Sequence, residues 1–277
     1  MAPERAKEAE QALRDILGRT PETDTDRNLI EASAQIFAAY NNVASQEGTA
    51  ALQTSEPAFP PIDLLNRPIQ EFKDNPYFAE AITSLNKTFY EVYGQRIGLE
   101  ISVPDCDWTE KEIKESMPTT EGEKVKSMVL FYPSELKGKQ GLVRIGQMFT
   151  LTNWSVQEHT PIVSEERIPT DYVRIEAVIN APNTNTTEQD LVNHAQKHHL
   201  LGQDLNLYIL GSRFAKLLDG RYFDQGSTWS RLPGSRYEGR VVPAYCDSDG
   251  GVGVNSFLAP DGRGPHIGGR FAGVKKA

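Results

Sequence analysis

Two histidines offer the most specific chemistry that this chain could carry. His194 and His198 stand four residues apart in a stretch that predicts a helix, so both imidazoles project from one face at a separation suited to sharing a divalent metal. Ala195, Gln196 and Lys197 lie between them, so the glutamate that a zinc protease carries beside its first histidine is missing. No third ligand can be named. A polar helix face without a metal therefore stands beside the metal site as an interpretation.

A second pattern begins like a calcium loop. Asp247 and Asp249 are one residue apart, and Gly250 would allow the turn, but position twelve is Leu258 where an EF-hand needs a bidentate glutamate. A polar hairpin turn explains the same residues. We therefore expect no cofactor here.

Phosphate-binding loops and nucleophile motifs are also incomplete. The runs 262–264 and 268–270 join glycine to arginine, but neither has the strand, lysine and helix start of a Walker loop. The chain has no Gly-x-Ser-x-Gly elbow, and the spacing of its histidines selects no general base. The sequence therefore assigns no catalytic residue and favours a binding protein over an enzyme.

The loops of the glycine-rich C-terminal segment, residues 221–277, mix arginine, tyrosine and aspartate. Arginine and tyrosine are the residues that binding surfaces favour. We expect this segment to form the recognition surface. The candidate ligand-binding residues are Arg236, Tyr237, Arg240, Tyr245, Asp247, Asp249, Arg263 and His266.

Helical periodicity predicts the elements that position these residues. A helix begins at Asn75–Pro76 and ends at Gly94, and a short one covers Thr109–Met117. A capping-box pattern from Thr186 predicts a helix through the histidines. After the interruption at Gly202, a buried helix restarts at Asp204 and ends at Gly220.

Alternating polar and apolar residues predict strands. The expected strands are Ile97–Val103, Lys124–Tyr132, Gly141–Phe149 and Asp171–Ile179, with the second and third paired as a hairpin. We therefore predict an α+β fold whose sheet is mostly antiparallel, with packed helices and a glycine-rich C-terminal strand-loop segment.

The first part of the chain predicts a separate organisation. Residues 1–49 contain two amphipathic stretches that predict a helical hairpin suited to packing or self-association, and the proline-rich run 50–68 predicts a linker. Residues 69–277 would then form the α+β domain.

Composition and charge narrow the class of protein. The 277 residues are 38% hydrophobic and 24% charged, within the globular range. No secretion signal or membrane span is visible, and two cysteines make no disulfide framework, so we expect a cytoplasmic protein. The net charge of −9 argues against nucleic-acid binding, although residues 221–277 carry eight Lys and Arg against five Asp and Glu.

The C-terminal 75 residues or so resemble the closing segment of certain uncharacterised bacterial proteins and, more loosely, the final strands of C-type-lectin-like domains such as those of formylglycine-generating enzymes. The similar runs are 205–213, 222–224, 228–232, 239–243, 251–254 and 267–270. The resemblance implies that Trp229 anchors the core and that Arg270 closes the last strand against it. It also implies a ligand-facing surface in the loops from Pro233 to His266.

Together these features predict a cytoplasmic binding or assembly protein. Its partner would be a protein or a small molecule, with no nucleic acid and no membrane, and its N-terminal helices would mediate homo-oligomerisation. One alternative is a metal-dependent hydrolase centred on His194 and His198. Another is a structural subunit of a larger particle.

Overall fold

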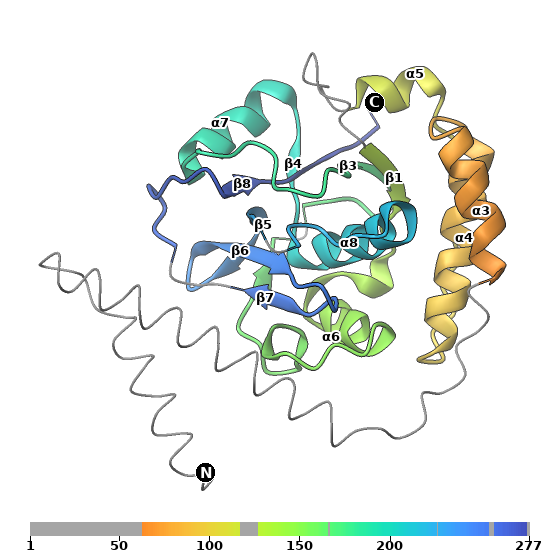
Figure 1. Cartoon of the computed structure of the whole chain (residues 1–277), viewed down its shortest axis with the longest axis horizontal. Helices are drawn as coiled ribbons and strands as arrows, with labels where there is room; N and C mark the ends of the chain where they lie inside the picture. The colour runs from red at the N-terminus through yellow and green to blue at the C-terminus, as the bar shows by residue number, and fades with distance from the viewer. Residues whose placement is uncertain (1–62, 117–126, 166, 226, 255–257, 276–277) are drawn as a thin grey trace, which may run out of the picture. The chain divides into compact units, whose positions relative to one another are not determined.

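The structure is a computed structural model that describes residues 63–116, 127–165, 167–225, 227–254 and 258–275. They belong to one compact unit, Pro60–Ala277. The predicted N-terminal hairpin and most of the predicted linker lie outside the described residues. The described part combines helices with largely antiparallel sheets, which confirms the α+β class (Figure 1).

Two small sheets form the β-framework. The first has the order β1-β3-β9-β4 and is antiparallel throughout. The second has the order β2-β5-β6-β7, and β8 joins it by pairing in parallel with β5. The strands are β1 (Ser127–Phe131), β2 (Val163–Ser164), β3 (Tyr172–Glu176), β4 (Leu201–Gly202), β5 (Trp229–Tyr237), β6 (Arg240–Cys246), β7 (Val252–Val254), β8 (Ile267–Gly269) and β9 (Phe271–Gly273).

Helix α8 (Leu205–Asp219) is the centre of the core, and ten of its fifteen residues are buried. Asp204 caps its first turn by accepting a hydrogen bond from the Leu207 amide, and Gly220 ends it in the left-handed conformation, as the sequence predicts. Gly211 lets α8 approach the first sheet, because a Cβ there would clash with Ile175. The same helix contacts β5 and β6 of the second sheet.

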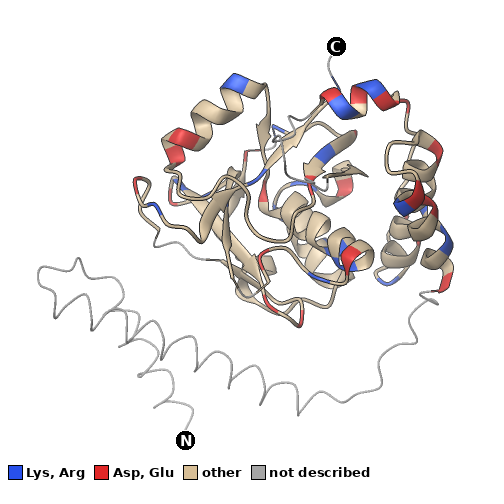
Figure 2. Cartoon of the chain, turned by 45° about the horizontal axis from the view of Figure 1, so that its top comes forward, with Lys and Arg blue, Asp and Glu red and all other residues tan. Residues whose placement is uncertain are grey.

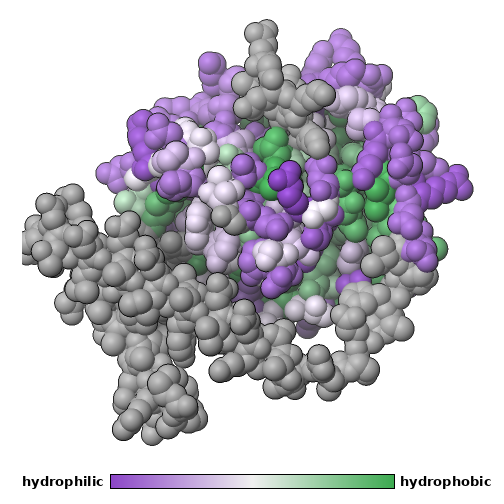
Figure 3. Space-filling view, in the orientation of Figure 1, coloured by the Kyte–Doolittle hydropathy of each residue, from purple (hydrophilic) through white to green (hydrophobic). Residues whose placement is uncertain are grey.

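The remaining helices surround this core (Figure 1). They are α3 (Asp63–Asp74), α4 (Ala79–Gln95), α5 (Glu110–Glu115), α6 (Gly138–Met148) and α7 (Glu188–His198), with short 3₁₀ turns η1 (Ser134–Leu136) and η2 (Trp154–Val156). Hydrophobic residues also reach the surface at the right of the view in Figure 3, where the α3 and α4 pair meets the rest of the domain. No helix of the described ranges has the length and apolar character needed to cross a membrane.

The predicted linker extends too far. Helix α3 begins at Asp63, so the last six residues assigned to the linker are helical. Pro68 suggests a helix breaker, but it lies in the first half of α3, where its ring is buried beside Leu65 and Phe72. Burial of these three apolar side chains offsets the helical hydrogen bond that Pro68, which has no backbone N–H, cannot donate.

Two predicted strands are wrong. Ile97–Val103 alternates in sequence but pairs with no strand, and Gly141–Phe149 lies mostly in helix α6. In α6 the residues Leu142 and Ile145 face the core, and Gly141 and Gly146 are sites of close packing. The glycines therefore mark tight contacts of a helix, and β1 pairs with β3 instead of forming the predicted hairpin.

Candidate functional site

The eight predicted ligand-binding residues do not form one site. Tyr237 and Arg240 lie beside the turn that joins β5 to β6, whereas Tyr245 and Asp247 lie at the other end of the same hairpin. A nine-residue strand such as β5 separates its two ends by about 25 Å. The C-terminal segment therefore presents several separate surfaces.

The acidic residues between β6 and β7 form a self-contained turn. The Asp247 carboxylate accepts hydrogen bonds from the amides of Asp249 and Gly251, at 3.0 and 2.6 Å. Gly250 supports the turn with a φ of +88°. These contacts explain the sequence pattern through local turn chemistry, and the described residues contain no group of three His, Cys, Asp or Glu side chains able to hold a metal.

Tyr245 belongs to an aromatic pair on the outer face of the second sheet. Its ring centroid lies 4.2 Å from that of Trp229, and the two side chains are partly buried. Gly253 opposite Tyr245 on β7 makes room for the ring, since a Cβ would clash with it. Burial raises the pKa of Tyr245. Trp229 is half-buried against Tyr245 and lies outside the hydrophobic core cluster, so the expectation that it anchors the core is wrong.

His194 and His198 do project from one face of α7, with ring centroids 4.6 Å apart. His194 also packs on Phe271 at 5.1 Å, and burial, followed by the repulsion of His198 and Lys197, lowers the pKa of His194. No third metal ligand accompanies the pair among the described residues. The structure therefore places the two histidines side by side as predicted, and it adds no other observation in favour of the metal-dependent alternative.

A groove beside α7 brings together residues from three parts of the chain. It has a volume of about 480 Å³ and is called the α7 groove here. Of the predicted ligand-binding residues, Arg236 lines it. The full lining is Glu165, Arg167, Leu191, Val192, Ala195, Gln196, His199, Leu200, Leu201, Gly202, Pro233, Gly234 and Arg236.

Apolar side chains form one wall of the α7 groove. Val192 is 37% exposed, while its neighbour Leu191 is fully buried. Gly269 admits Leu191, because a Cβ at this position would lie 2.6 Å from the leucine side chain. Gly202 likewise admits Pro233. Glycines thus let α7 approach β8 and let β4 approach β5 closely enough to form the groove.

An ion-pair network forms the opposite rim. Glu165 lies between two guanidinium groups, 3.1 Å from Arg236 and 3.0 Å from Arg167. Arg236 also donates a hydrogen bond to the Pro233 carbonyl. The carboxylate is held by two cations, so the rim carries a net positive charge beside an apolar wall. Sequence analysis missed Glu165 and Arg167 because they lie about seventy residues before Arg236.

Capping hydrogen bonds and charged residues stabilise the two ends of α7. Thr187 accepts a hydrogen bond from the Asp190 amide and Asp190 accepts one from the Thr187 amide, a capping box one residue later than the predicted one. Acidic residues occupy its first turn and Lys197 its last, as the red and blue ends in Figure 2 show. Arg263 pairs with Asp190 at 3.1 Å, which places that predicted residue at the start of α7.

His266 has a structural role through its backbone. Its carbonyl accepts a hydrogen bond from the Trp229 amide at 2.7 Å, where β8 joins β5, and its side chain is exposed. Arg240 is also exposed. Neither residue lines a described pocket.

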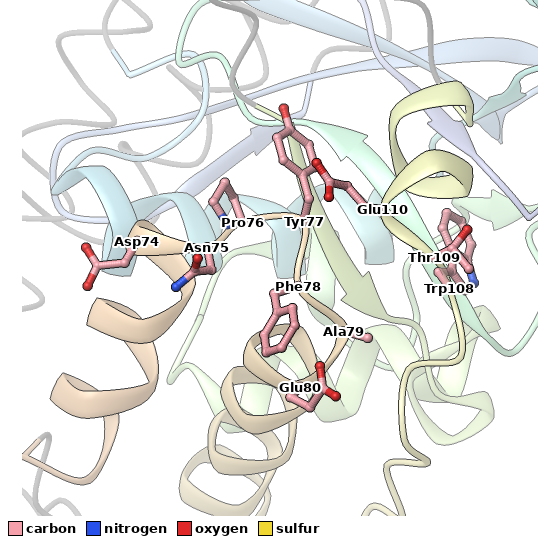
Figure 4. A pocket seen from close by; sticks show the side chains of 10 residues that line it. All are labelled: Asp74, Asn75, Pro76, Tyr77, Phe78, Ala79, Glu80, Trp108, Thr109 and Glu110. Atoms are coloured by element: carbon pink, nitrogen blue, oxygen red, sulfur yellow. The ribbon is translucent and has the colours of Figure 1, made fainter.

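A second pocket lies far from the C-terminal segment in sequence. It surrounds the turn between α3 and α4 and has a volume of about 470 Å³ (Figure 4). We call it the α3–α4 pocket. Its lining residues are Asp74, Asn75, Pro76, Tyr77, Phe78, Ala79, Glu80, Trp108, Thr109 and Glu110. Sequence analysis did not select any of them.

Comparison with known proteins gives no relative: no protein-family model, curated protein or solved structure matches this chain.

Proposed function

We propose that the protein is a cytoplasmic binding protein and that the α7 groove receives an apolar group of its ligand or partner. The observation that carries the proposal is the groove itself, in which a largely buried apolar wall with one exposed side chain, Val192, accompanies a rim with two arginines. Binding sites are typically concave and mostly apolar, with a few polar groups that fix orientation. The guanidinium groups of Arg167 and Arg236 would provide that orientation.

The lining favours binding over catalysis. It contains no serine, cysteine or threonine that could serve as a nucleophile. Its one carboxylate, Glu165, has each of its two oxygens paired with an arginine, so neither oxygen is left unengaged to accept a proton from a substrate. The buried thiols support a reduced compartment, because Cys106 and Cys246 are both unpaired.

Fluorescence titration with 8-anilinonaphthalene-1-sulfonate, which joins an apolar body to an anionic group, tests this proposal. We expect saturable binding at one site per chain. Val192→Glu places a carboxylate in the apolar wall and should weaken binding at least about tenfold.

Leu64→Glu is the matched control, because Leu64 is also an exposed apolar residue on a helix and does not line the groove. This variant should bind the dye as the unaltered protein does. Equal losses in the two variants, or no saturable binding at all, would contradict the proposal.

A further inference from the structure

The α3–α4 pocket has a composition that differs from that of the α7 groove, and the two share no residue. Tyr77 and Phe78 stand at its opening, and Trp108, only 2% exposed, lies beneath. Figure 4 shows Tyr77 beside Glu110 and Phe78 near Glu80, whereas the Asp74 side chain points away from them. The lining includes no lysine or arginine. It therefore combines ring surfaces with negative charge.

Phe78 occupies a helix position at which phenylalanine is unfavourable. It is the N-cap residue of α4, where its side chain makes no capping hydrogen bond, and it is 56% exposed. Serine, threonine, asparagine or aspartate at an N-cap stabilises a helix relative to a residue that cannot cap. A large exposed aromatic side chain at this position breaks a local rule, which is characteristic of functional sites.

The electrostatic balance of the pocket favours a cation. The start of α4 contributes about half a positive charge, and the Lys114 ammonium neutralises Glu110 through a close ion pair. Glu80 remains, and its full negative charge outweighs the half positive charge of the helix dipole. Glu80 is exposed and lies in the first turn of α4.

The protein already places one ammonium group against this wall. Lys114 Nζ lies 5.0 Å from the centroid of the Tyr77 ring while pairing with Glu110. An ammonium within about 6 Å of a ring centroid is attracted to the face of the ring. Tyr77 and Glu110 thus show how an aromatic side chain and a carboxylate of this pocket hold a cation.

We propose that the α3–α4 pocket binds a lysine or arginine side chain from a basic segment of a partner protein. The half-buried Tyr77 ring and the exposed Phe78 ring do not surround a small ammonium ion, as the closed cage of a free quaternary ammonium site would. The protruding Phe78 ring instead offers apolar area that a peptide backbone and an aliphatic side-chain stem can cover. Glu80 then meets the terminal charge.

Fluorescence anisotropy with a labelled peptide of alternating glycine and arginine, at low salt, tests the proposal on the full chain. We expect Glu80→Gln and Phe78→Ala each to weaken binding about fivefold or more. A peptide of alternating glycine and serine should not bind.

The controls separate the pocket from the general negative charge of the chain. Glu91→Gln removes an exposed carboxylate from the same helix, and Leu64→Ala removes an exposed apolar side chain from α3; neither should change the affinity. Equal weakening by Glu80→Gln and Glu91→Gln would overturn the proposal. Displacement of the peptide by tetramethylammonium at lower concentration than by acetyl-arginine amide would also overturn it, in favour of a small quaternary ammonium ligand.

Discussion

Asp224 and Arg270 carry opposite charges in the interior, and both side chains are 0% exposed. The Asp224 carboxylate accepts hydrogen bonds from Tyr208, Thr228 and Ser230 in addition to the ion pair at 3.2 Å. The Arg270 guanidinium donates to backbone carbonyls of β3 and of the segment after it. The network leaves few polar atoms without a partner, which is the condition under which a buried ion pair is tolerated.

Removing one member of this pair should be costly. Asp224→Ala leaves the Arg270 charge buried without its counter-ion, and we expect a loss of about 3–5 kcal/mol in the free energy of unfolding, measured in urea. Arg263→Ala breaks an exposed pair with Asp190 and should change stability by less than about 1 kcal/mol. Similar losses in the two variants would contradict the assigned role of the buried network.

Glu176 gives a prediction about pH. Burial raises its pKa to about 7 from the ordinary value of 4.5, against the opposing attraction of Arg270. The folded state therefore binds more protons than the unfolded state between these values, so this group lowers stability as pH rises through that window. Glu176→Gln should stabilise the protein by ~2 kcal/mol at pH 8 and by less at pH 5. Urea unfolding at both pH values checks this, and an equal gain at both would contradict it.

For individual residues, sequence analysis could predict where a side chain would lie but not which other side chain it would contact. Arg270 was expected to close the last strand against the core, and it lies fully buried there. Nothing near Asp224 in sequence indicated that it would meet Arg270, because the two are 46 residues apart. Such a pairing depends on tertiary structure, which periodicity does not encode.

At the scale of elements, helix α6 shows how close packing and helix propensity compete. Gly141 lies against the backbone of Leu136, and a Cβ there would overlap it. Alanine favours a helix over glycine by about 1 kcal/mol, but a backbone cannot yield as a side chain does. We expect Gly141→Ala to lower the free energy of unfolding by ~1–3 kcal/mol.

Gln140→Ala controls for propensity, because Gln140 is an exposed residue of the same helix. Thermal unfolding followed by circular dichroism should show little change in this variant. If Gly141→Ala raised the thermal unfolding midpoint, the prediction would be contradicted, because the space between Gly141 and the Leu136 backbone would then be large enough for a methyl group.

Elements with strong end signals were predictable. The helix after Asp204, the strand around Tyr172 and the short helix after Thr109 all have clear caps or clean alternation, and the structure confirms each of them. Helix α6 was mistaken for a strand because its glycines weaken the helical pattern and its apolar residues partly alternate. The packing partner that justifies those glycines, Leu136, becomes visible only in the fold.

At the scale of the whole molecule, the α7 groove could not be predicted because it is assembled from segments distant in sequence. Arg236 was selected for its residue type, while Glu165 and Val192 became apparent only when β2, α7 and β5 were placed together. The expectation of one recognition surface also treated the C-terminal loops as neighbours. The antiparallel β5 and β6 hairpin carries them to opposite ends.

Self-association through the N-terminal residues stays a prediction that the boundary of the domain makes testable. Since α3 begins at Asp63 and the compact unit at Pro60, a chain that starts at Pro60 should keep the thermal unfolding midpoint of the domain. Sedimentation velocity should show a smaller oligomer for this chain than for the full one. An unchanged oligomer would locate association within residues 60–277.

The end of the chain joins both sheets, since β8 pairs with β5 in one and β9 pairs with β3 and β4 in the other. During translation, these last strands leave the ribosome after every other element of the domain. Helix α8 and both sheets must therefore wait for β8 and β9 before the interior can close, and a chain that lacks these two strands would expose its apolar interior to chaperones and proteases.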